Sequence, residues 1–283
     1  MENQVNANPL AKYFRQPAIY MKLPSKGKFW AEGSLELPVT GELPVYPLTA
    51  RDEVSLRTPD ALMNGSSVVD VIQSCCPSIK DAWKMPSIDV DAVLIAIRIA
   101  SYGNQMDVDT RCPHCGEENT HSFDLHHSLA NIVPPDYNQK VEFDELRIKL
   151  KPQCYFGVNN QNIIDFQQQR MLKALESPDI DSEIRAQEIS ESMGKLVEVA
   201  LANVTESTEY IEMPDGSRVD NTEFIREFYR NAKSEVVKLV QDKLAQFNVD
   251  GAVKSQIAPC NSCEKEYPVS VLFDYSNFFA LGS

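Results

Sequence analysis

The sequence predicts an α+β protein in which a four-cysteine zinc ribbon is split by a long, mainly helical insertion. Three observations lead to this fold class. Short strand-like runs fill the first part of the chain, and apolar residues at helical spacing dominate the middle. Two Cys-x-x-Cys pairs, Cys112 with Cys115 and Cys260 with Cys263, lie far apart but have the spacing of zinc knuckles.

The bulk composition fits a globular protein of a reducing compartment. The 283 residues carry a formal net charge of −14, which disfavours a protein whose main task is to bind phosphates. Hydrophobic residues make up 43% of the chain, so a core can form without disulfides. We expect neither a signal peptide nor a membrane segment, because no run approaches the roughly 18 apolar residues that a spanning helix needs.

Changes in periodicity divide the chain into four parts. We expect an N-terminal arm over 1–18, a β segment with a small helical unit over 19–104, a split zinc ribbon over 105–131 and 251–283, and a hairpin with a helical insertion over 132–250.

The β segment should hold short strands at 19–23, 35–37 and 45–48, separated by Pro and Gly turns. Helices should begin at Thr49, which is a good N-cap, at Thr58-Pro59, and at Ser66 or Ser67. The strongest helical pattern runs over 88–101 and ends before Gly103.

The remaining elements follow from alternation or from helical spacing. We expect strands at 106–109 and 118–125, hairpins over 139–152 and 208–219, helices over 159–175, 181–203 and 221–247, and a last strand over 267–273.

The four knuckle cysteines, Cys112, Cys115, Cys260 and Cys263, predict one structural metal site. Two sulfurs on each tight turn can complete a tetrahedral shell. Four thiolates leave no open position for a substrate, so a catalytic metal is not expected. We favour zinc because the flanking strands are ribbon-like, although sulfur ligation alone leaves iron open. One ion would fasten the middle of the chain to its end.

Other histidines and cysteines have ordinary interpretations. His114 could compete as a ligand, the other histidines could form a second metal site, and Cys75-Cys76 could be a redox-active pair. Exposed histidines and buried cysteines are the favoured interpretations. The residues concerned are His114, His121, His126, His127, Cys75, Cys76 and Cys154.

The sequence contains no recognisable catalytic motif. Nucleotide-binding glycine loops, the G-x-S-x-G elbow and the H-E-x-x-H motif are all missing from it, so we expect neither an enzyme nor a small-molecule substrate. Zinc ribbons often bind nucleic acid, but acids surround both knuckles and disfavour this role. These acids are Glu117, Glu118, Asp124, Glu264 and Glu266.

Both ends of the chain leave two interpretations open. The aromatic tail, with Tyr275, Phe278, Phe279 and Leu281, could pack in the core or insert into a neighbouring subunit. The N-terminal arm poses the same choice.

Three stretches in order over 19–130 give the chain a family resemblance. They are Leu23-Pro-Ser-Lys-Gly-Lys-Phe29; Leu48-Thr-Ala-Arg-Asp-Glu53 with Leu56 and Asp60-Ala-Leu-Met-Asn-Gly65; and Ile88-Asp-Val-Asp91 with Ile95-Ala-Ile-Arg98, Ser101-Tyr-Gly103 and Cys112-Pro-His-Cys115-Gly116. With these motifs the sequence resembles the baseplate hub proteins of T-even-type contractile-tailed bacteriophages. The helices over 155–250 carry no part of the resemblance.

The resemblance implies a structural virion protein without enzymatic activity. It would connect other baseplate and hub proteins in the tail, be needed for baseplate assembly, and be built in the host cytoplasm. Two other functions remain open: a zinc-ribbon nucleic-acid-binding regulator, and a transient tail-assembly chaperone that leaves the particle.

Overall fold

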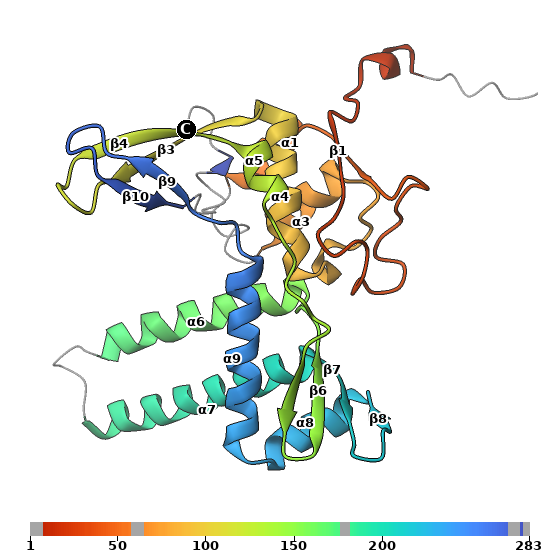
Figure 1. The fold of residues 1–283 in the computed structure, drawn as a ribbon, viewed down its shortest axis with the longest axis vertical. Coiled ribbons are helices and arrows are strands. Elements are labelled where there is room, and N and C mark those ends of the chain that lie inside the picture. Colours follow the sequence, from red (N-terminus) through yellow and green to blue (C-terminus); the bar gives the residue numbers. More distant parts are fainter. Residues whose placement is uncertain (1–7, 58–64, 176–181, 271–277, 280–283) are drawn as a thin grey trace, which may run out of the picture.

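The computed structural model describes residues 8–57, 65–175, 182–270 and 278–279, and these form an α+β fold with two hydrophobic cores. The mixture of helices and strands confirms the predicted class. One core lies among the N-terminal elements and the ribbon, and the other lies within the insertion. Helix α9 (Ser234–Gly251) runs from the insertion back to the ribbon (Figure 1).

The first core is built by short strands and helices in chain order. They are β1 (Ile19–Met21), β2 (Leu43–Val45), α1 (Ala50–Leu56), α3 (Ser66–Cys75), the 3-10 helix η2 (Ala82–Lys84) and α4 (Ser87–Tyr102). The 3-10 helix η1 (Pro9–Tyr13) precedes them outside the core, with Leu10 and Tyr13 exposed.

The predicted strands of this part are only partly confirmed. β1 pairs antiparallel with β2, which begins two residues and ends three residues earlier than expected. The strand predicted at 35–37 is wrong, because Leu35 makes only an isolated bridge with Ile79. The helix predicted to begin at Thr58-Pro59 lies outside the described residues.

Thr49 caps α1 as predicted, and the cap also anchors the N-terminal arm. Thr49 accepts a hydrogen bond from the Asp52 backbone N–H, while the Asp52 carboxylate accepts one from the Thr49 N–H at 2.8 Å. The Arg15 guanidinium lies 3.3 Å from the same carboxylate and donates to the Pro47 and Ser74 carbonyls. The described end of the arm is therefore tied to its own chain.

The Leu23-Pro-Ser-Lys-Gly loop is held by a buried carboxylate at the start of α4. Asp89 accepts hydrogen bonds from the Ser25 N–H at 2.7 Å, the Ser25 hydroxyl at 2.5 Å and the Trp30 indole N–H at 2.9 Å. Burial nevertheless raises the pKa of Asp89 to about 6. One of the motifs behind the resemblance thus fixes the loop to the central helix.

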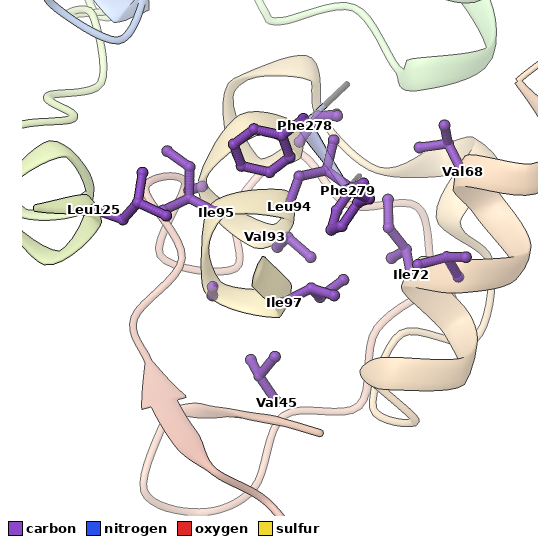
Figure 2. Packing of buried hydrophobic residues seen from close by; sticks show 14 of the residues in the cluster. Val45, Val68, Ile72, Val93, Leu94, Ile95, Ile97, Leu125, Phe278 and Phe279 are labelled. Atoms are coloured by element: carbon purple, nitrogen blue, oxygen red, sulfur yellow. The ribbon is translucent and has the colours of Figure 1, made fainter. Parts of the chain in front are cut away.

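The described part of the aromatic tail packs in the first core. Phe278 and Phe279 are buried and lie beside Leu94 and Ile95 of α4, with Ile72 of α3 nearby (Figure 2). The buried Arg98 side chain donates to the Phe278 carbonyl and lies over the Phe278 ring. For these two residues, the structure selects core packing over a hook into a neighbour.

Two antiparallel hairpins form the ribbon. The first is β3 (Gln105–Arg111) with β4 (Glu118–Asp124), and the second is β9 (Gln256–Pro259) with β10 (Glu266–Val269). The strands expected on either side of the first knuckle are confirmed, with β3 longer than predicted. A short helix that was not predicted, α5 (Leu125–Ala130), follows β4 and carries His126 and His127.

The insertion contains an antiparallel sheet of four strands. Its order is β5-β6-β7-β8, formed by β5 (Lys140–Phe143), β6 (Leu146–Leu150), β7 (Thr208–Glu212) and β8 (Arg218–Val219). Both predicted hairpins are confirmed, but the pairing of β6 with β7, across more than 50 residues, was not predicted.

Two long helices connect β6 to β7 and project side by side from the sheet. They are α6 (Tyr155–Leu175) and α7 (Ser182–Glu206) (Figure 1). The single helix predicted over 221–247 is wrong: α8 (Thr222–Asn231) and α9 are separate, because Ala232 and Lys233 adopt extended conformations. The break lets Tyr229 of α8 and Val236 of α9 both enter the second core.

No helix in the described parts of the chain combines the length and apolar character that spanning a bilayer requires.

Candidate metal centre

The turns of the two ribbon hairpins bring four cysteine sulfurs together. The Sγ atoms of Cys112, Cys115, Cys260 and Cys263 all lie within 4.8 Å of one another. The separation is 3.8 Å between Cys112 and Cys263, and 3.6 Å between Cys115 and Cys260. These distances are too long for disulfides. They match the separation of about 3.8 Å that four Zn–S bonds of 2.3 Å give in a tetrahedron.

Both knuckles use the same backbone hydrogen bonds. In the first, the Cys112 N–H donates to Glu117 and the Gly116 N–H donates back to the Cys112 carbonyl. In the second, the Cys260 N–H donates to Lys265 and the Glu264 N–H donates back to Cys260. Each turn therefore needs a left-handed residue after its second cysteine: Gly116 has φ 78° and Glu264 has φ 59°.

Backbone N–H groups of the turns point at the sulfurs. His114 donates to the Cys112 sulfur, and Ser262 donates to the Cys260 sulfur, each at 3.4 Å. N–H groups of Cys263 and Ser262 lower the pKa of the Cys260 thiol to about 6. The second turn thus favours the thiolate of Cys260, which is the form of cysteine that binds a metal, and the four clustered residues could hold one ion.

A buried asparagine links the two knuckles. The Asn119 amide nitrogen donates to the Glu117 carbonyl at 3.0 Å and approaches the Cys260 sulfur at 3.6 Å. Its amide oxygen accepts from the Asn261 N–H at 2.7 Å. Asn119 was not predicted from the sequence, because the corresponding position of the second knuckle is Tyr267 and no shared motif marks it.

Tyr267 ties the hairpins together beside the cysteine cluster. Its buried side chain places the hydroxyl 2.8 Å from both the Thr110 hydroxyl and the His121 Nε2. The His121 and Tyr267 rings also meet edge to face, with centroids 5.6 Å apart. The hairpins are therefore fixed to one another by side chains as well as by the knuckles.

The other histidines and cysteines singled out from the sequence lie elsewhere. His114, His126 and His127 are exposed. Cys75 and Cys76 are buried in the first core, and burial raises the pKa of both thiols, to about 12 for Cys75. Cys154 is only half-buried at the start of α6, whereas the sequence predicted a core position.

A sequence model of a protein family, described as T4 bacteriophage base plate protein, matches residues 17–280. The chain belongs to this family. The match includes both knuckles and the entire insertion, where sequence reasoning found no resemblance. Searches of the curated proteins and of the solved structures found no match.

Membership of the T4 bacteriophage base plate protein family supports a structural role in the phage baseplate and a location in the virion tail. It also suggests interaction with other phage proteins and a function other than catalysis. The resemblance stated from the sequence is thereby confirmed at the level of the baseplate.

The left-handed turn residues of this baseplate protein give a test of the knuckle geometry. Glu264→Gly should raise the free energy of unfolding by about 0.5–1 kcal/mol, because glycine adopts a positive φ without strain. Gly116→Ala should lower it by about 1 kcal/mol, since the added Cβ would meet only the Arg111 side chain, at an ordinary contact distance of 3.9 Å, and the backbone conformation alone is penalised. Chemical denaturation measures both.

Glu266→Gly is the matched control, because it removes the same charge from a residue in the extended strand β10. It should destabilise the protein, since glycine weakens a strand. If Glu264→Gly and Glu266→Gly changed stability equally, the left-handed turn would not be the cause.

Proposed function

We propose that the chain is a connector of the hub or inner baseplate, needed for baseplate assembly, and that it is built in the host cytoplasm and retained in the tail. The observation that carries this proposal is the projecting α6–α7 pair. Phe166, Met193 and Val197 are more than 40% exposed on these helices, where solvent exposure of large apolar side chains costs free energy. A neighbouring subunit that covers them would remove this cost.

We further propose that Cys112, Cys115, Cys260 and Cys263 hold one structural zinc ion. The sulfur separations, the N–H groups aimed at sulfur and the closed set of four thiols support zinc in the role of a fold-stabilising ion. Exposed acids beside the turns, such as Glu117 and Glu264, oppose the alternative function of a nucleic-acid-binding regulator.

Metal analysis tests the zinc proposal. Protein purified without chelator should contain about one zinc per chain, and Cys260→Ser should lose it because three thiolates bind far more weakly than four. Cys154→Ser is the control, since Cys154 lies outside the cluster and its removal should leave the metal content unchanged. Full metal content in Cys260→Ser would contradict the four-cysteine site, and iron in place of zinc would contradict the choice of metal.

Co-sedimentation with purified tails tests the connector function. The native chain should sediment with tails in a fixed ratio, whereas a transient assembly chaperone would be missing from them. Met193→Asp should reduce incorporation at least several-fold, because it places a charge in the proposed apolar contact.

Val39→Asp is the control for the added charge, since Val39 is fully exposed in the segment before β2 and lies outside the insertion that carries α6 and α7. Equal losses with both variants would argue against α6–α7 as the contact. Tight binding of the chain to duplex DNA at physiological salt would favour the regulator.

A further inference from the structure

The solvent face of the four-stranded sheet is positively charged in a chain whose formal net charge is −14. Strand alternation and the register place seven side chains on this face, while Val141, Ile148 and Ile211 point into the second core. The seven are Lys140, Glu142, Arg147, Lys149, Tyr210, Glu212 and Arg218. Four cations and two acids leave a local excess of positive charge. We call this surface the basic sheet face, and it consists of Lys140, Arg147, Lys149, Arg218 and Tyr210.

A single carboxylate organises three of the cations. Glu212 lies 2.9 Å from the Lys140 Nζ, 3.3 Å from the Arg147 Nε and 3.5 Å from the Arg218 Nε. The Glu212 side chain is only 10% exposed, whereas Arg147 is 52% and Arg218 is 59% exposed. One buried negative charge therefore lies among three positive charges, and the excess positive charge faces the solvent.

The arginines retain unused hydrogen-bonding capacity. Each approaches Glu212 most closely through Nε, and the terminal nitrogens of Arg147 and Arg218 donate no hydrogen bond to any of the described residues. The Arg218 guanidinium lies 4.5 Å from the centre of the Tyr210 ring, which holds it over the sheet. Two preorganised guanidinium forks suit bidentate binding of carboxylates.

The charge arrangement also costs the isolated chain stability. Lys140 and Lys149 are directly opposite each other in the register of β5 and β6, and like charges in such a pair repel. Local costs of this kind are characteristic of functional surfaces. An acidic partner would remove the repulsion, since its carboxylates would neutralise both ammonium groups.

We propose that the basic sheet face docks a carboxylate-rich segment of another protein. The site is small, with four cations on four short strands, and this suits a peptide segment better than a nucleic-acid duplex, whose affinity grows with the number of phosphates contacted. The remaining surface, with its large negative charge, would repel a polyanion that extended beyond the sheet. As a statement about a tail partner, the inference rests on the proposed connector function.

A labelled poly-L-glutamate peptide of about twelve residues serves as the probe, with fluorescence anisotropy on the purified full chain. Binding should weaken about tenfold in the double variant Arg147→Gln, Arg218→Gln, because two carboxylate-binding groups are lost. The control is Arg226→Gln, Arg230→Gln, which removes two exposed, ion-paired arginines from α8 of the same insertion. It should change the affinity less than twofold.

Lys149→Gln keeps the test decisive if the double variant unfolds, because Lys149 contacts Asn138 and not Glu212. This variant should weaken peptide binding several-fold. Equal losses in the two double variants, tighter binding of duplex DNA than of the peptide, or self-association of the chain that displaces the peptide would each overturn the proposal. The assay needs no tails, so its failure is distinguishable from a failure of the connector function.

Discussion

The convergence of four cysteine sulfurs is the constraint on which the rest of the structure depends. It joins two turns 145 residues apart, at Cys115 and Cys260, and so fixes the end of the chain to its middle. Closing a loop of this length costs the unfolded chain about 5 kcal/mol. A structural zinc ion of the proposed kind supplies roughly 10 kcal/mol or more, which exceeds that cost. Asn119 and Tyr267 add direct bonds between the hairpins but are too few to replace the ion.

Fixing the second hairpin also limits where the aromatic residues Phe278 and Phe279 can lie in space. Strand β10 stops at Val269, and Phe278 and Phe279 then occupy the first core beside α4. Arg98 holds the Phe278 carbonyl from within that core. The aromatic pair thus packs among the N-terminal elements although it lies more than 170 residues after them in the sequence, as Phe278 and Arg98 show, and the cysteine cluster keeps it within reach.

The loop closed by the cysteines carries its own core. Val141, Ile148, Ile211 and Val240 pack there, apart from the core that holds α4. Such an insertion can present the α6–α7 pair and the basic sheet face to partners without perturbing the cysteine cluster. This separation of the proposed metal site from the two proposed binding surfaces would suit the proposed connector function.

The sequence predicts those features that depend on residues close together in the sequence. Cysteine spacing located both knuckles, and Thr49 marked the cap of α1. Pairing between β6 and β7 was not predictable, because alternation reveals a strand but not its partner. The break at Lys233 was not predicted, because the packing of Tyr229 and Val236 into the second core selects it. The left-handed Glu264 was not predicted either, because the hydrogen bonds of the knuckle turn impose a conformation that glutamate does not favour.

Hydrogen–deuterium exchange of the native and the metal-stripped protein tests the clasp most directly. The account predicts that stripping removes protection from β9 and β10 and from the part of α4 beneath Phe278, while β5 to β7 stay protected by their own core. Unchanged exchange in β9 and β10, or an equal loss of protection across the insertion, would contradict it.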